Sequence, residues 1–453
     1  MQNELRILSP TAILGYGFPK KSFERGLEME PDLIAVDAGS VDPGPYYLGE
    51  GVSFTDKTAV KRDLKIMLKA AQKINIPVIV GTAGGSGADP HLKWCTDIVK
   101  EIAKEEKLNF KLASIQAEQK KSEILEKFQS GKISPLFPVS ELSQSEIEAS
   151  THIVAQMGVE PFIKALDMGA EVIIAGRAYD PSVFASYCIQ QGFNPGLALH
   201  MGKIMECASI AADPGSGSDS MFAILKDDHF ILEPLNKERK CTTTSVAAHT
   251  LYEKTDPYKL AGPGGIIDLS ESEFEQIDER RVKVSGSKFI ADKNYTLKLE
   301  AAKEVGYRTI SIAGIRDSIM IKNLDHIINE VKASVIDNFD YLKKDEYQLL
   351  FKVYGKNAVM DNLEVKNDIK AHELGLVIEV VAESQELANT ICSFARSTML
   401  HYGYPDRVGT AGNLAFPYSP SDIKAGKVYE FSIHHLLKVE NPCELFSIEI
   451  DDI

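Results

Sequence analysis

The chain lacks any apolar run long enough to cross a bilayer, which takes roughly 20 consecutive residues. Its first residues, MQNELRILSP, carry scattered charge and no apolar core of the kind found in secretory signal peptides. We therefore expect a cytoplasmic protein with no membrane partner.

Cysteine is scarce: the six cysteines of this 453-residue chain are dispersed and include no Cys-x-x-Cys pair. Structural zinc sites and disulfide frameworks need closely spaced or paired cysteines, so the sequence argues against both and fits a reducing compartment.

Positive charge is also in deficit, with 50 Lys and Arg against 65 Asp and Glu and a net charge of −15. Because nucleic-acid binding depends on basic side chains that contact phosphates, we expect no nucleic-acid partner. One local basic pocket would still suffice for an anionic small molecule. The length corresponds to roughly two to three domains, and we expect a homo-oligomer.

The N-terminal part alternates short apolar runs with amphipathic stretches. Runs rich in apolar and β-branched residues, which read as buried strands, occur at 5–8, 33–37, 77–80, 111–116 and 170–175. A helical pattern is expected at 152–166. This alternation predicts an α/β fold, with a parallel, doubly wound N-terminal sheet over residues 1–223 that carries the site.

The pattern of apolar and polar residues changes after residue 223. Residues 224–405 combine several β-rich runs with a long helical stretch at 317–339, which predicts a second, α+β domain. Residues 406–453 are predicted to form a short C-terminal segment that contains β-strands and docks on the rest, given its apolar content.

The loop after the second predicted strand, DAGSVDPGPYYLG at 37–49, concentrates polar side chains at a strand end, where open α/β sheets bind ligands. Asp37 and Asp42 are candidate acid–base residues, with Tyr46 as a catalytic hydrogen-bonding group and Ser40 as a substrate contact. The alternative is that the aspartates cap backbone amides in turns.

The loop after the third strand, GTAGGSGADPH at 81–91, is typical of an anion cradle built from backbone amides. Its lack of a Lys-Ser or Lys-Thr ending excludes a P-loop. We predict that the substrate contacts in this loop are Thr82, Gly84, Gly85 and Ser86.

Arg177 and Asp180 follow the strand at 170–175, and we predict that both bind substrate. The Arg177 guanidinium can hold a carboxylate or phosphate through two hydrogen bonds. Equally, Arg177 can pair with Asp180 or Asp167 and only hold the turn.

Two further expectations concern ligands farther along the chain. His200, Lys203 and Glu206 are spaced three apart and are predicted to present one helical face to the same rim, the alternative being a solvated face. The sequence does not decide whether a divalent metal binds, because the spacing of the available oxygen and imidazole ligands is not diagnostic. These candidate ligands are Asp37, Asp42, Asp89, His91 and Glu206.

Five segments occur together in an order that resembles one family. They are GAEVIIAGRAYDPSVFAS, GKIMECAS, TTTSVAAHTLYEKTDPY, TISIAGIRDSIM and TAGNLAFPYSPSD. The chain resembles the acyclic terpene utilisation AtuA-like family over most of its length, in the branch with a fused short C-terminal domain. The resemblance implies catabolic small-molecule work without fixing a reaction, and the loop at 37–49 departs from the family pattern.

The residues favour a lyase or hydratase acting on a small carboxylate or its acyl-CoA thioester. One alternative is a hydrolase or acyl-transfer enzyme with Ser40 or Ser86 as nucleophile, although the chain has no GxSxG elbow. Another is a non-catalytic subunit that binds an acyl-CoA or carboxylate within a larger catabolic complex.

Overall fold

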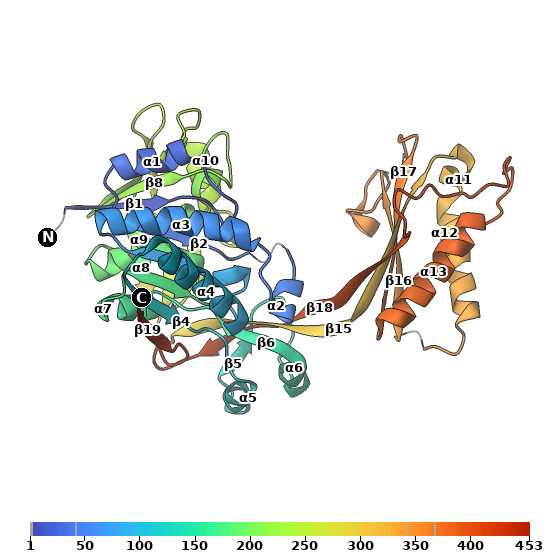
Figure 1. Ribbon diagram of the computed structural model, residues 1–453, viewed down its shortest axis with the longest axis horizontal. Coiled ribbons are helices and arrows are strands. Elements are labelled where there is room, and N and C mark those ends of the chain that lie inside the picture. Colours follow the sequence, from blue (N-terminus) through green and yellow to red (C-terminus); the bar gives the residue numbers. More distant parts are fainter. Residues whose placement is uncertain (1–2, 41–42, 344, 367) are drawn as a thin grey trace. The chain divides into compact units, whose positions relative to one another are not determined.

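The computed structural model describes residues 3–40, 43–343, 345–366 and 368–453. The chain forms two compact units, Met1–Lys303 with Phe431–Ile453, and Glu304–Glu430. Two long strands, β15 (Thr296–Ile315) and β18 (Asp422–Lys438), carry the chain from one unit into the other (Figure 1).

The first unit is built on a ten-stranded mixed sheet. Its strand order is β12-β13-β9-β8-β1-β2-β3-β7-β4-β19. The stretch from β1 to β4 is parallel, and antiparallel strands extend both edges. The bounds are β1 Glu4–Ser9, β2 Leu33–Asp37, β3 Val78–Gly81, β4 Lys111–Ile115, β7 Val172–Ala175, β8 Met221–Lys226, β9 His229–Pro234, β12 Glu273–Gln276, β13 Val282–Ser285 and β19 Ile448–Asp452.

Helices cover both faces of this sheet because alternate strand residues point to opposite sides. Leu33 and Ala35 pack into the core beneath one set of helices, whereas Ile34 and Val36 pack into the core beneath the other. The first set is α7 Glu160–Asp167, α8 Asp180–Gln190 and α9 Pro195–Met205, and the second is α1 Lys20–Glu28, α3 Lys57–Ile74 and α4 Asp89–Glu106. The predicted α/β fold is confirmed.

Shorter elements complete the first unit. A three-stranded sheet has the order β10-β11-β14. The remaining bounds are α2 Tyr46–Glu50, α5 Lys121–Gln129, β5 Ile133–Pro135, α6 Gln144–Ala149, β6 Ser150–Ala155, α10 Thr243–Thr250, β10 Lys259–Gly262, β11 Gly265–Asp268 and β14 Lys288–Ala291.

The second unit packs helices on an antiparallel sheet. Strands β16 (Tyr347–Tyr354) and β17 (Leu374–Ala382) pair with each other, and β17 also pairs with β15. The core of the unit includes Ile378 of β17 and residues of the helices. The helices are α11 Ser318–Lys322, α12 Leu324–Asn338 and α13 Gln385–His401.

Two helix predictions are wrong in part. Residues 150–155 form strand β6, which pairs antiparallel with β15, and helix α7 begins only at Glu160. Ile153 and Val154 are β-branched, and the pairing with a distant strand outweighs the apolar spacing that resembled a helix. The stretch at 317–339 is two helices that meet at Asn323.

The compact units divide the chain differently from the boundaries expected near 223 and 405. Residue 223 lies inside β8, which pairs with β1, so residues 224–303 belong to the first unit. The C-terminal strand β19 pairs with β4 and returns the chain end to the same unit.

Candidate functional site

The loops after β2, β3 and β7 meet at one edge of the parallel sheet. The amide of Ala38 donates to the carbonyl of Gly81 (3.0 Å), and the amide of Thr82 donates to the carbonyl of Gly176 (3.1 Å). The three predicted loops therefore lie side by side, as expected for neighbouring parallel strands.

The loop at 81–87 runs so close to the turn at 176–178 that side chains would clash. Gly87 has φ 70°, and a Cβ there would lie 2.1 Å from the amide nitrogen of Arg177. Thr82 adopts a left-handed φ of 47°, and its Oγ1 accepts a hydrogen bond from the Ala178 amide (3.2 Å). Thr82 thus ties two loops together.

Arg177 is buried and engaged by protein carboxylates. Its Nε lies 2.5 Å from Glu300 Oε2, its Nη2 lies 3.4 Å from Glu300 Oε1, and its Nη1 lies 3.6 Å from Asp180. Burial opposes the charge of Arg177, but Glu300 and Asp180 hold its pKa above the ordinary value. The observed contacts match the alternative in which Arg177 pairs within the protein.

Glu300 on β15 is a buried partner that the sequence did not reveal. Burial alone would raise its pKa, but Arg177 and the Lys298 ammonium, 2.8 Å from Oε1, hold the pKa well below the ordinary value. Glu300 is therefore an ionised carboxylate fixed by two cations.

Several predicted residues line one small pocket, which we call the strand-end pocket. Its free volume of about 20 Å³ fits one water molecule. Ser40, Gly85, Ser86 and Arg177 meet here. The complete lining is Ser40, Gly44, Leu48, Gly85, Ser86, Val154, Arg177, Glu300 and Phe431.

Three other predicted residues do not line the strand-end pocket or lie outside the described residues. Tyr46 begins α2, with its ring edge-on to Tyr47. Gly84 has φ 64°, and a Cβ there would lie 2.8 Å from the His91 side chain. Asp42 lies outside the described residues.

Asp37 ends β2 as a buried carboxyl with one satisfied oxygen. Oδ2 accepts a hydrogen bond from the Gly39 amide (3.0 Å), whereas Oδ1 has no hydrogen-bond partner in the described part of the chain. Burial, followed by the nearby carboxyls of Asp180 and Glu206, raises the pKa of Asp37 well above its ordinary value, and Arg177 only partly opposes the rise. Asp37 is thereby suited to hold a proton.

Glu206, at the end of α9, is a second buried carboxyl. Lys203 forms an ion pair with Oε1, and Oε2 has no partner among the residues that the structure describes. Burial raises the pKa of Glu206 to about 8, an effect that Lys203 opposes and Asp180 reinforces. Around neutral pH, a proton on Oε2 makes Glu206 a donor.

Tight helix packing brings Glu206 to this edge. A Cβ on Gly202 would lie 2.4 Å from the carbonyl oxygen of Pro181, so α9 packs closely against the start of α8. Asp180 lies in the first turn of α8, and its Oδ1 makes no hydrogen bond to the described residues. We call Asp37, Asp180 and Glu206 the carboxyl cluster.

Tyr179 borders the carboxyl cluster. Its hydroxyl is buried and has no hydrogen-bond partner within the described ranges. Burial, with smaller contributions from Glu206 and Asp180, raises the pKa of Tyr179. Such a concentration of unsatisfied, proton-carrying groups is costly for folding and is typical of functional sites.

The predicted face of α9 is realised only in part. Lys203 and Glu206 reach the carboxyl cluster, but His200 bonds Ser287 through Nδ1 (2.6 Å) and Thr250 through Nε2 (3.0 Å). Residues six apart differ by about 120° around a helix, so His200 and Glu206 face different neighbours. The expectation that all three share one rim was wrong for His200.

The candidate metal ligands that the structure describes are not gathered into one group. His91 Nε2 bonds the carbonyls of Tyr47 (3.1 Å) and Val52 (3.0 Å), while Asp89 begins α4. Among the residues that the structure describes, no group of three or more His, Cys, Asp or Glu is arranged to hold a metal ion.

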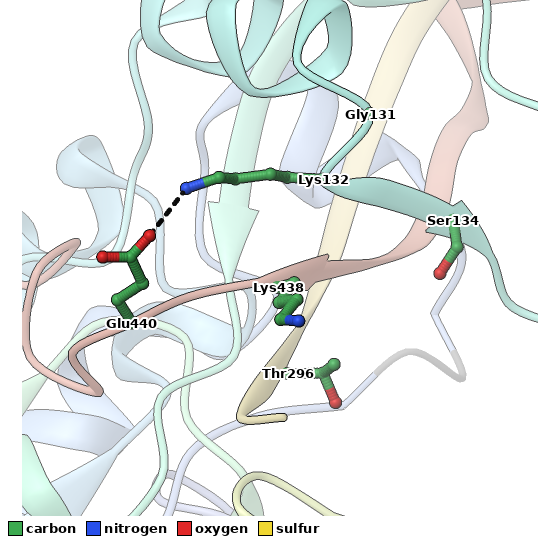
Figure 2. A pocket seen from close by; sticks show the side chains of 6 residues that line it. All are labelled: Gly131, Lys132, Ser134, Thr296, Lys438 and Glu440. Atoms are coloured by element: carbon green, nitrogen blue, oxygen red, sulfur yellow. Dashed lines mark hydrogen bonds and ion pairs between the residues drawn. The ribbon is translucent and has the colours of Figure 1, made fainter. Parts of the chain in front are cut away.

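A larger pocket lies between β5 and β18 (Figure 2). Its volume is about 480 Å³, and Lys132 and Glu440 form an ion pair across 3.2 Å at one side. The Glu440 side chain is 84% exposed, so its charge is hydrated and adds little free-energy cost to folding. The pocket is lined by Gly131, Lys132, Ser134, Thr296, Lys438 and Glu440. The carboxyl cluster is the stronger candidate.

Comparison with models of protein families gives a match that covers most of the chain. The family model described as acyclic terpene utilisation family protein AtuA matches residues 55–414. No curated protein and no solved structure matches. In the described ranges, no helix combines the length and apolar character needed to cross a membrane.

Proposed function

Because the chain belongs to the acyclic terpene utilisation family AtuA, we propose that it is a cytoplasmic catabolic enzyme acting on a small carboxylate or its acyl-CoA thioester. The proposed chemistry is of the lyase or hydratase type, in which a proton moves at a carbon next to a carbonyl and water is lost or gained. The carboxyl cluster supplies the acid–base groups.

The observation that carries this proposal is the unsatisfied state of three neighbouring carboxyls. Asp37 Oδ1, Asp180 Oδ1 and Glu206 Oε2 are all buried and have no hydrogen-bond partner among the described residues, and only Asp180 Oδ1 has a cation near it, Arg177 Nη1 at 3.6 Å. Unsatisfied buried oxygens cost roughly 1–3 kcal/mol each, so a scaffold without a function for them has little reason to retain them.

The three carboxyls can divide the work. With a pKa of about 8, Glu206 holds a proton at neutral pH and can deliver it to a departing hydroxyl as general acid. We assign the second proton-transfer role to Asp37. Lys203, ion-paired with Glu206, places positive charge where an enolate would develop.

Arg177 then has a positioning role in this proposal. Its fork is occupied by Glu300, so it orients Asp180 and influences Asp37 electrostatically instead of clamping the substrate. We assign the substrate's anionic group to the strand-end pocket beside Gly85 and Ser86. The free volume of about 20 Å³ is too small for that group, so this assignment requires the lining, which includes the 47% exposed Phe431, to open.

The test is turnover by the full-length protein. A panel of hydroxy acids, unsaturated acids and their CoA thioesters is incubated with enzyme, and gain or loss of water is followed by mass spectrometry. Glu206→Gln keeps the shape and removes the proton, so kcat should fall by roughly 10²–10⁴-fold. Glu379→Gln is the matched control, because Glu379 is equally buried, at 5% exposed, and lies in the other compact unit.

The outcomes separate the proposed class from its alternatives. Hydrolysis of the thioester without change in the acyl group would favour the hydrolase alternative, with Ser40 or Ser86 to be tested as nucleophile. Saturable binding without any turnover would favour the non-catalytic subunit. Equal loss in Glu206→Gln and Glu379→Gln, with lowered Tm in both, would indicate misfolding and refute the specific role of Glu206.

A further inference from the structure

Lys254 lies at the rim of the carboxyl cluster, in the segment between α10 and β10. Its Nζ stands 5.5 Å from the centroid of the Tyr179 ring, and its side chain is half-buried. Glu253, the residue before it, has a left-handed φ of 62°, and the Lys254 amide donates to the Leu251 carbonyl (3.2 Å). A strained non-glycine turn therefore positions this lysine, as is common at functional sites.

The amine of Lys254 differs from its neighbour Lys203. Lys203 Nζ is ion-paired with Glu206 and lies 5.1 Å from the Tyr252 ring centroid. Lys254 Nζ has no hydrogen bond or ion pair with any described residue and lies over the Tyr179 ring. Of the two amines, only Lys254 is left without a carboxylate at 4 Å or less.

The surroundings of Lys254 supply the other groups that an amine nucleophile needs. Glu206 Oε2 and the Tyr179 hydroxyl are buried atoms without partners in the described part of the chain, at residues 5% and 8% exposed. The Tyr179 ring lies against the Lys254 amine, and Glu206 interacts electrostatically with Lys254. Both groups can therefore exchange protons near the amine.

We propose that Lys254 is a catalytic nucleophile that forms an imine with the carbonyl of an aldehyde or keto-acid substrate. This narrows the small carboxylate of the proposed function to one that carries an aldehyde or ketone group, and it rests on that function. Burial and then the neighbouring Lys203 ammonium lower the pKa of Lys254, which favours the neutral amine.

The step balances without an external oxidant or reductant. The neutral Nζ adds to the carbonyl carbon, and a proton passes from nitrogen to the former carbonyl oxygen to give a carbinolamine. Glu206 donates its proton to that hydroxyl, which leaves as water while the C=N bond forms. The iminium then withdraws electrons from the adjacent carbon, whose proton can pass to the Glu206 carboxylate left by the preceding step.

The experiment traps the imine on the full-length protein. Formaldehyde and glyoxylate are added separately with cyanoborohydride, and the modified lysines are located by peptide mass spectrometry over a time course. Lys254 should be modified more than about fivefold faster than Lys259, an exposed lysine on the adjacent strand, because burial and the Lys203 ammonium lower the pKa of Lys254. Lys254→Arg keeps a cation and should remove this fast-reacting site.

Two comparisons decide the outcome. The proposal would be overturned if Lys254 reacted no faster than Lys259 with either probe. It would also be overturned if the Lys254→Arg protein were still modified at a lysine as rapidly as the wild type. If Lys254→Arg turns over the substrate panel normally while Glu206→Gln does not, the imine step fails and the acid–base function stands. If Lys254 is trapped rapidly but Glu206→Gln turns over normally, the amine role stands and the acid–base assignment fails.

Discussion

Two buried glutamates, one in each compact unit, have the same exposure and opposite electrostatics. Glu206 and Glu379 are both 5% exposed. Burial raises the pKa of Glu206 to about 8, whereas at Glu379 the nearby Lys352 and Arg308 overcome burial and lower the pKa.

The difference comes from how each carboxylate is satisfied. Glu379 Oε1 lies 2.6 Å from Arg308 Nε and its Oε2 lies 2.6 Å from Lys352 Nζ, so both oxygens face a cation. Glu206 has one cation on Oε1, an unpartnered Oε2 and the carboxyl of Asp180 nearby. Burial therefore produces a proton donor only where charge compensation is incomplete, and this distinguishes a candidate site from a structural ion pair.

The largest expected effect is on turnover and concerns the same contrast at Asp37. Asp37→Asn keeps the shape but cannot exchange a proton, so kcat on a responsive substrate should fall by roughly 10²–10⁴-fold. Glu379→Gln should leave kcat unchanged, since its carboxylate is fully paired. Steady-state kinetics with thermal melts as a folding check would measure both, and normal turnover by Asp37→Asn would make that loop structural.

The strands and loops that surround the candidate site were largely predictable from local sequence. The runs at 33–37 and 170–175 are apolar and bounded by turn residues, so both strands were expected nearly as observed. Three loops at one sheet edge followed, because the carboxyl ends of adjacent parallel strands share an edge. Asp37, Arg177 and Asp180 were consequently named as candidates.

The partners were not predictable, because they depend on distant pairing. Glu300 reaches Arg177 only through the antiparallel register of β15 and β6, in which Glu300 lies opposite Val154. Lys254 reaches Tyr179 through a turn that shows no helical or strand periodicity. Lys203 and Glu206 were expected to share a face, but the burial of their ion pair depends on how α9 packs against α8. The available signal for Glu300 was an acidic residue set between Leu299 and Ala301 in a strand.

A second prediction concerns stability and compares Glu300 with Glu379. Glu300→Ala would leave Arg177 buried with only Asp180 at 3.6 Å, and breaking a buried pair in this way costs about 3–5 kcal/mol of unfolding free energy. Glu379→Ala should cost less, because the Arg308 and Lys352 side chains are 40% and 45% exposed and can be hydrated. Urea denaturation of both variants measures the difference.

The double variant Arg177→Met with Glu300→Leu is the control for that prediction. Removing both charges leaves neither Arg177 nor Glu300 as an unpaired buried ion, and their other partners, Asp180 and Lys298, have side chains that are 29% and 23% exposed and can be hydrated. Its loss of stability should therefore be smaller than the sum of the losses in Arg177→Met and Glu300→Leu. A loss below about 1 kcal/mol for Glu300→Ala would contradict the view that Glu300 holds Arg177 in place.

The smallest expected effect is a pH dependence of stability with opposite signs at the two glutamates. The folded pKa of Glu206, about 8, exceeds its ordinary value of 4.5, so between these pH values the native protein binds the proton more tightly than the unfolded chain. The contribution of Glu206 to the unfolding free energy is therefore fully present below pH 4.5 and is lost as pH rises toward 8. Glu206→Gln cannot lose a proton, so its stability relative to the wild type should rise as the pH increases through this window.

Glu379 should give the reverse. Its folded pKa lies below the ordinary 4.5, so its stabilising contribution is present above that pH and disappears as pH falls through the lowered value. Relative to the wild type, Glu379→Gln should be less stable at neutral pH, and the difference should shrink in acid. Denaturant titrations of the wild type and both variants across this range decide the matter. Parallel curves for the two variants would mean that Glu206 is as well compensated as Glu379, and the case for a proton donor in the carboxyl cluster would fail with that result.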